Sequence, residues 1–268
     1  MDEKRSVLAI SLILLAVLAA AVGVYFMFFR TEPAENLKGV SAPTKAEAGR
    51  AKSAQAIPIF PPTPLKDSDV LIRTLTKELS ADPRLDSWLQ TKDIIRKFAA
   101  AVDAIAEGRS PQKQIDFFVP QGKFQVLKKR GREFIDPISY ERYNPAAEVF
   151  ISFNARDCVR FYRGLKKLIQ EAYRELGYPD RDFDQTLRRA LLELLETPVV
   201  EGDILVEKGV KTYVLADPKL EGLSEAQKHF LRLGPQNVAA VQIKLREMAL
   251  ALGLPVEDLP TPRTVVGR

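Results

Sequence analysis

The sequence predicts a mainly α-helical globular domain with a minor β component, preceded by a single N-terminal transmembrane helix and a polar linker. Three observations lead to this prediction. Residues 7–29 form an uncharged apolar run, and the residues after it are rich in alanine, proline and charge without apolar periodicity. Further on, apolar residues recur mostly at the three- and four-residue spacing of amphipathic helices. We therefore divide the chain into a head (1–6), an anchor (7–29), a disordered Pro/Ala-rich linker (30–66), a globular domain (67–254) and a loose tail (255–268).

The apolar run is long enough to span a bilayer. At about 1.5 Å per residue it extends roughly 35 Å as a helix, against a hydrocarbon core of about 30 Å. A cleaved signal peptide is the alternative, with the alanines at 19–21 as the cleavage site. Because the run continues to Phe29, beyond the roughly 7–15 residues of a signal-peptide core, we expect an uncleaved anchor in contact with the lipid bilayer.

Charge does not decide the orientation of this anchor. Lys4 and Arg5 precede it, but Arg30, Lys38 and Lys45 follow it, so the positive-inside rule favours neither side. A short head before a long apolar run is typical of signal anchors whose N-terminus stays inside. We therefore expect the globular domain to lie outside the cytoplasm.

The first helices of the domain are predicted from their end signals. A Ser-Asp pair begins a helix over residues 68–79, and Asp82 caps a helix whose first residue is Pro83. A third helix covers residues 93–107 and ends before a glycine. Between residues 110 and 144 the helical pattern disappears. There we expect three short extended segments, at 114–119, 123–127 and 132–135.

The second half of the domain returns to helices with one hairpin. In chain order we expect a long helix over 155–176, a helix over 187–195 with a capping box at Asp182 and Gln185, a β-hairpin of 204–207 with 212–215, a short helix after a second capping box at Ser224 and Gln227, and a last helix over 237–252.

Composition excludes several classes of function. The net charge is +5, but residues 1–66 carry +3 of it, so the domain is nearly neutral and has no general field for nucleic acid. Cys158 is the single cysteine, which excludes an intrachain disulfide. With His229 as the single histidine, a zinc site of histidines and cysteines lacks ligands, and we expect no metal or cofactor. His229 could act as a general base, but a half-buried structural role is the favoured interpretation.

Four segments of the domain resemble a known family. They are Ser139-Tyr140-x-Arg142-Tyr143, Ala172-Tyr173-x-x-Leu176-Gly177-Tyr178-Pro179, Asp217-Pro218-x-Leu220-Glu221-x-Leu223, and Gln227-Lys228 with Leu231-Arg232-x-Gly234-Pro235-x-Asn237. Together they resemble the bacterial "domain of unknown function 3014" family, from about residue 67 to residue 247. The resemblance implies an envelope protein of Gram-negative-type bacteria and no known reaction, so no catalytic residue is carried over. The chain departs from the family pattern at Ala104, His229 and Phe230, which argues against an indispensable role for these positions.

A basic helix face is the first candidate for binding. Arg156, Arg160, Arg163 and Lys167 recur at spacings of three and four on the long helix, opposite its apolar stripe. Such a face could hold a phosphate, a carboxylate or an anionic glycan. A solvated helix face is the alternative.

Tyrosines and one arginine form the second candidate. Tyr140, Arg142, Tyr143 and Tyr178 belong to the residue types that dominate binding hot spots, because their rigid area ends in a polar tip. The alternative is that the tyrosines close the core between the extended segments and the long helix.

We therefore predict a non-enzymatic protein of the bacterial inner membrane with no catalytic residue. Its domain would face the periplasm and bind another envelope protein or an anionic envelope polymer. One alternative is a hydrolase that uses carboxylates such as Asp217 and Glu221, which lie four residues apart. Those two residues are equally explained as a turn cap and an ion-pair partner. A further alternative is an outward-facing sensor of small molecules.

Overall fold

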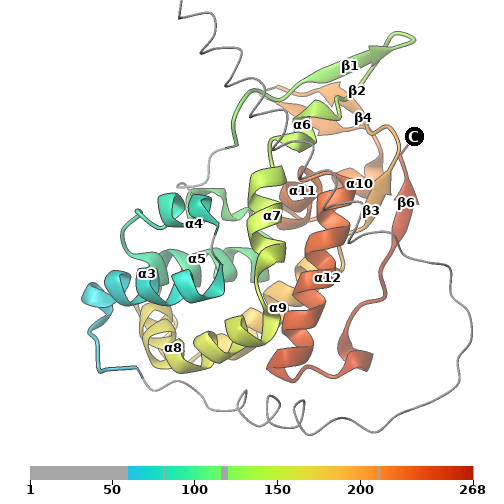
Figure 1. Cartoon of the computed structure of the whole chain (residues 1–268). Coiled ribbons are helices and arrows are strands. Elements are labelled where there is room, and N and C mark those ends of the chain that lie inside the picture. Colours follow the sequence, from blue (N-terminus) through green and yellow to red (C-terminus); the bar gives the residue numbers. More distant parts are fainter. Residues whose placement is uncertain (1–59, 81, 116–119, 211, 268) are drawn as a thin grey trace, which may run out of the picture. The chain divides into compact units, whose positions relative to one another are not determined.

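The computed structural model describes residues 60–80, 82–115, 120–210 and 212–267 of the chain. These residues form a mainly helical domain with a small sheet, as predicted (Figure 1). The predicted anchor, residues 7–29, lies outside the described residues, as does most of the linker. Among the helices that the structure does describe, none combines the length and the apolar character that a membrane span requires.

The described residues form α-helices, short 3-10 helices (η) and strands, with the following bounds. The helices are η1 (Leu65–Asp67), α3 (Ser68–Leu79), α4 (Pro83–Trp88), α5 (Ile94–Ala106), η2 (Pro111–Lys113), α6 (Ile138–Glu141), α7 (Asn144–Ser152), α8 (Ala155–Glu175), α9 (Phe183–Leu195), α10 (Pro218–Glu221), α11 (Glu225–Leu231), α12 (Pro235–Leu252) and η3 (Val256–Asp258). The strands are β1 (Val126–Lys129), β2 (Arg132–Ile135), β3 (Val199–Glu201), β4 (Leu205–Lys208), β5 (Tyr213–Leu215) and β6 (Thr264–Val266).

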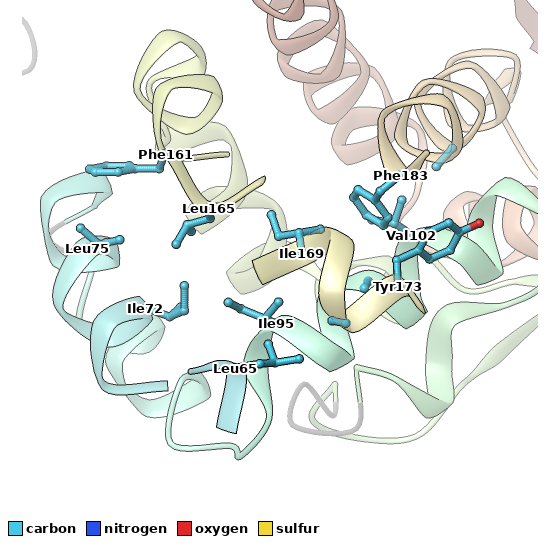
Figure 2. Close-up of a cluster of buried hydrophobic side chains, with 13 residues drawn as sticks. Leu65, Ile72, Leu75, Ile95, Val102, Phe161, Leu165, Ile169, Tyr173 and Phe183 are labelled. Carbon is cyan, nitrogen blue, oxygen red and sulfur yellow. The ribbon is translucent and has the colours of Figure 1, made fainter. Parts of the chain in front are cut away.

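The largest core cluster lies where α3, α5, α8 and α9 meet. The long helix α8 contributes Leu165, Ile169 and Tyr173, whose spacing of four residues places them on one buried face (Figure 2). Ile95 of α5 and Phe183 of α9 pack against that face. A second cluster surrounds α12, which packs against α7, α8 and α9. A smaller cluster of Leu85, Leu89 and Val149 joins α4 to α7, so three apolar clusters hold the described helices together.

The predicted helix ends are confirmed at most positions. The Asp82 carboxylate accepts from the Arg84 amide at the start of α4, and Ser224 forms the predicted capping box with Gln227. Asp182 also caps α9, but its carboxylate accepts from the Asp184 amide two residues on. The helix start at Asp182 is therefore right, while the reciprocal bond predicted with Gln185 is absent among the contacts of these two described residues.

The larger of the two sheets is four-stranded and antiparallel, in the order β1-β2-β4-β5. Its last pair is the predicted hairpin, in which Glu207 faces Val214 and the Gly209 amide donates to the Thr212 carbonyl at 2.8 Å. The prediction that helical structure disappears between residues 110 and 144 is wrong in part, because η2 and α6 lie there. Both are single turns, too short to leave an apolar period in the sequence.

The tail predicted as loose is ordered. Residues 264–266 form β6, which pairs in parallel with β3, and the Val199 amide donates to the Arg263 carbonyl at 2.8 Å. Leu259 is buried in the cluster around α12. These backbone bonds and this burial explain why the prediction of a loose tail is wrong for residues 255–267, whereas residue 268 lies outside the described residues.

The last part of the predicted linker also belongs to the domain. Leu65 is only 5% exposed, and the ring of Phe60 stacks on that of Phe161 with 6.2 Å between centroids. Residues 60–66 therefore contribute apolar area to the core, and the prediction of a disordered linker is wrong for this part. Residues 30–59 lie outside the described residues.

Candidate functional site

A cavity of about 300 Å³ lies between the four-stranded sheet and the short helices α6, α10 and α11. That volume is at the lower end of the range for small-ligand pockets. Its walls combine aromatic, aliphatic and charged side chains. The lining residues are Phe124, Ile135, Ser139, Tyr140, Arg142, Tyr143, Ile204, Val206, Thr212, Tyr213, Val214, Leu215, Glu221, Glu225, Lys228, Leu231 and Arg232.

Ser139 fixes α6 against the strand side of the cavity. Its side chain is buried, and its Oγ donates to the Gln125 carbonyl at 3.0 Å while accepting from the Gln125 amide at 2.8 Å. Just before α6, the Asp136 carboxylate accepts from the Ile138 amide at 3.0 Å. This short helix is therefore held at both its first turn and its centre. Tyr140 of the helix and Arg142 just after it line the cavity.

Tyr140 supplies a polar tip on a mostly buried ring. Burial, with a smaller contribution from the charge of Asp203, raises the pKa of Tyr140 to about 12. The phenol is therefore neutral at physiological pH. Its hydroxyl makes no hydrogen bond with the described part of the chain. It is available as a donor or an acceptor for a ligand.

Arg142 is held loosely in the cavity wall. Its Nη1 donates to the Gly122 carbonyl and its Nη2 to the Tyr143 hydroxyl, both at 3.4 Å. The guanidinium lies 5.4 Å from the centre of the Tyr143 ring, a cation–π distance. Its Nε is buried without an acceptor among the described residues. The side chain therefore keeps donor capacity that the domain itself does not use.

The acidic residues of the wall are already paired. Lys228 lies 3.0 Å from Glu221 and 2.9 Å from Glu225. The other oxygen of Glu221 accepts from the Leu215 amide at 2.9 Å. That backbone bond first, and Lys228 second, lower the pKa of Glu221. The carboxylate is therefore a fixed anion that ties α10 and α11 to the edge strand β5.

Asp217 is a helix cap, as the structural alternative to a catalytic role predicted. Its carboxylate accepts from the Lys219 amide at 2.8 Å and so caps α10. Glu221 likewise has its predicted basic neighbour in Lys228. Both carboxylates of the hypothetical hydrolytic pair are thus engaged in local contacts.

The predicted basic face of α8 is divided by its contacts. Arg160 pairs with Asp157 at 3.1 Å, and Arg163 donates to the Ala251 carbonyl at 3.2 Å near the end of α12. The side chains of Arg156 and Lys167 are exposed and make no hydrogen bond or ion pair with the described residues. None of these four side chains lines the cavity. Two cations, rather than four, remain available on this face.

Tyr178 is separated from the other predicted tyrosines. Its ring packs on Tyr173 with 4.9 Å between centroids, and the Arg181 guanidinium lies 4.8 Å above it. Its hydroxyl points to the buried carboxylate of Asp103 at 3.5 Å. Tyr178 therefore belongs to the helical core, whereas Tyr140, Arg142 and Tyr143 meet at the cavity.

His229 is half-buried and hydrogen-bonded. Its Nδ1 lies 3.1 Å from the Ser110 hydroxyl. Burial, with a smaller contribution from Arg232, lowers the pKa of His229 to about 4. The ring is neutral near pH 7, in agreement with a structural role. No group of three or more histidine, cysteine, aspartate or glutamate side chains within the described ranges could hold a metal ion.

Sequence reasoning missed part of the cavity wall. Phe124 and Tyr213, whose rings lie 5.6 Å apart, were not candidates, nor were Lys228 and Arg232. Side chains of a strand point alternately to its two faces, so Tyr213 lies on the same face of the hairpin as Leu215. This alternation could have indicated Tyr213. The cavity brings together segments that are far apart in the sequence, such as those that contain Phe124, Val206 and Glu221. No local signal in the sequence indicates this approach.

Comparison with known proteins gives one finding. Residues 94–249 match the family described as "Protein of unknown function (DUF3014)". No curated protein and no solved structure matches the chain. The match covers α5 to α12, with both walls of the cavity and more than half of the sequence. The chain therefore belongs to the DUF3014 family, as its four segments indicated.

Proposed function

We propose that this protein is a single-pass protein of the bacterial inner membrane whose domain faces the periplasm and binds a partner there without catalysing a reaction. The observation that carries the proposal is the cavity. Three of the residues predicted for binding line it: Tyr140 from α6, and Arg142 and Tyr143 from the junction between α6 and α7. The uncharged run over residues 7–29 supports the membrane part of the proposal.

The contacts of the acidic residues favour binding over hydrolysis. A general acid needs a carboxylic acid whose pKa is raised towards neutrality. Glu221 has a lowered pKa and is held by Leu215 and Lys228. Asp217 is engaged as a helix cap. Both carboxylates therefore stabilise the local structure, which supports a binding role for the cavity rather than a catalytic one.

The dimensions of the cavity favour an envelope protein over a polymer as the partner. A volume of about 300 Å³ accommodates one or two side chains, or a small molecule, but not an extended chain of sugars. In the part of the chain that the structure describes, the basic face of α8 has two side chains without a hydrogen bond or an ion pair, those of Arg156 and Lys167. Two charges are few for holding an anionic polymer. The cavity is equally compatible with the alternative of a small-molecule sensor.

Protease accessibility tests the proposed location. A peptide tag is added after residue 268, and intact spheroplasts of a Gram-negative host are treated with protease. We expect the tag and the domain to be degraded from outside, while a cytoplasmic control protein stays intact. Protection of the tag until the membrane is lysed would contradict the periplasmic location.

Site-specific crosslinking tests the proposed binding site. A photoreactive amino acid at Phe124, which lines the cavity and is 41% exposed, should give a crosslinked product in cells. The same amino acid at Lys167, exposed on α8 and outside the cavity, is the matched control. The product at Phe124 should weaken when Arg142→Gln is added. Equal crosslinking at both positions would contradict a binding role for the cavity.

A further inference from the structure

Among the described residues, the guanidinium of Arg142 lacks a carboxylate acceptor such as those of Arg84 and Arg96. Arg96 donates to Glu175 at 2.6 Å, and Arg84 donates to Glu148 at 2.7 Å. Arg142 has two bonds of 3.4 Å and a buried Nε without a partner among the described residues. Buried donors almost always find an acceptor, so an unpaired one in a cavity wall points to a group that the described residues do not supply.

The unpaired charge of the cavity is positive. Glu221 and Glu225 are both paired with Lys228, at 3.0 and 2.9 Å. Arg142 and Arg232 also line the cavity, and no carboxylate of the described residues lies within ion-pair distance of either. A ligand for this cavity is therefore expected to be an anion.

The shape and surroundings of Arg142 select the kind of anion. A guanidinium presents two parallel N–H groups that match the two oxygens of a carboxylate. Glu221 and Glu225 line the same cavity, and they would repel a doubly charged phosphate more strongly than a singly charged carboxylate. Much of the remaining wall is apolar or aromatic, with Leu231 and the ring of Tyr140 among the lining groups.

We propose that the cavity binds an organic carboxylate, with Arg142 donating to the carboxylate and the aromatic and aliphatic walls enclosing the apolar part of the ligand. This inference rests on the proposed function, because it names the chemistry that the binding site recognises. A charge-assisted bond of about 2.7–2.9 Å is stronger than the two bonds of 3.4 Å that it would replace. Turning its Nε and one Nη towards the ligand would therefore cost the guanidinium these two long bonds and part of its contact with the Tyr143 ring.

The carboxylate could belong to a free small acid or to the C-terminus of a polypeptide. Two acidic probes separate these sources: phenylacetate, and a four-residue peptide that ends in phenylalanine with a free carboxyl group. Phenylacetamide and the amidated peptide are the neutral controls. Binding to the full-length protein in detergent micelles is measured by titration calorimetry. We expect at least one acid to bind while its amide does not.

Substitution of the anchor residue gives the second measurement. Arg142→Gln keeps hydrogen-bonding capacity but loses the charge, and it should weaken the binding of the acid by roughly ten- to a hundredfold. Arg156→Gln is the matched control, because Arg156 is an exposed arginine outside the cavity. It should leave the affinity unchanged. If Arg142→Gln does not fold, the nitrogen resonance of Arg142 Nε in the wild-type protein should shift when phenylacetate is added.

The outcomes separate this inference from the proposed function. Binding of the peptide acid alone would assign the carboxylate to a polypeptide C-terminus, and binding of phenylacetate alone to a small acid. Failure of both acids, equal binding of the amides, an unchanged affinity in Arg142→Gln or an unshifted Nε resonance would overturn the inference. A cytoplasmic domain that binds phenylacetate through Arg142 would contradict the proposed location and leave the inference intact.

Discussion

The backbone of Gly234 lies directly against the side chain of Tyr140. A Cβ added to Gly234 would be 2.6 Å from both Cβ and Cγ of the tyrosine, closer than real Cβ contacts. Gly234 has φ +81°, in the left-handed region, and it precedes α12. This contact joins α6 to the turn between α11 and α12. Because Gly234 has no side chain, Tyr140 can pack directly on the backbone of this turn, and this packing sets the position of the tyrosine in the cavity wall.

We expect Gly234→Ala to destabilise the domain by about 2–4 kcal/mol, because it adds a steric overlap to the strain of a positive φ. Urea unfolding followed by the fluorescence of Trp88, the single tryptophan, measures the change. Gly131→Ala is the matched control, since Gly131 has φ +77° with no neighbouring atom within 4 Å of an added Cβ. It should cost about 1–2 kcal/mol. Equal losses in the two variants would contradict the contact with Tyr140.

A second prediction concerns the start of α5. Asp93, the residue before this helix, has a left-handed φ of 57°, and its carboxylate binds Arg96 rather than a backbone amide. The cap comes from α3, where the two oxygens of Asp69 accept from the amides of Asp93 and Ile94, both at 2.9 Å. We expect Asp69→Ala to lower the free energy of unfolding by about 1–2 kcal/mol.

Asp180→Ala is the control for this cap, because Asp180 is exposed in the loop after α8. Its effect should stay within about 0.5 kcal/mol. Thermal or urea unfolding compares the two variants with the wild type. A loss for Asp69→Ala no larger than that for Asp180→Ala would show that α5 starts without help from α3.

A third prediction concerns β6. The Gly267 amide donates to the Glu201 carbonyl at 2.7 Å, and an added Cβ would lie 2.3 Å from the Asp203 carbonyl oxygen. Gly267→Ala should therefore release β6 from β3. The Val199 amide, which donates to Arg263, should then exchange its hydrogen faster. Val266→Ala, at a side chain that is 73% exposed, should not change this exchange. Unchanged protection of Val199 in Gly267→Ala would contradict the close packing at Asp203.

The fourth prediction is a pH dependence that involves His229. Its pKa is lowered from the usual 6.5 to about 4 in the folded protein, chiefly by burial. Between pH 6.5 and 4 the unfolded chain therefore binds a proton that the folded domain does not, so stability falls as the pH falls. Above pH 6.5 the ring is neutral in both states and makes no difference.

We expect the stability lost between pH 7 and pH 4.5 to be smaller in His229→Gln than in the wild type, by on the order of 2 kcal/mol. The comparison of the two proteins removes the contribution of carboxylates that titrate in the same range. Urea unfolding at the two pH values provides the measurement. An equal loss in both proteins would mean that His229 is as easily protonated in the folded state as in the unfolded chain.

The elements that could be predicted from the sequence carry long or well-capped apolar patterns. The helix over 155–176 has an apolar face that repeats over several turns, and the structure has α8 there. The capping box at Ser224 is likewise visible within four residues. In contrast, α7 was not assigned. It is nine residues long, and it packs against both α4 and α12, so its apolar residues do not form a single stripe.

Long-range contacts explain what sequence reasoning did not predict. The pair β3 and β6 consists of two three-residue strands that have no local signal of pairing. The cavity is formed in the same way, because Phe124, Arg142, Tyr213 and Lys228 come from four separate segments. The residue types suited to binding were recognisable from the sequence, but their division between the cavity, α8 and the helical core required the tertiary structure.

The parallel pairing of β3 with β6 also has a consequence for the kinetics of folding. It closes a loop that contains α10, α11 and α12, and closing a long loop costs entropy before its few hydrogen bonds form. Contacts of high sequence separation of this kind form slowly. We therefore expect the helices between the two strands to pack first, and β6 to dock last onto a nearly complete domain.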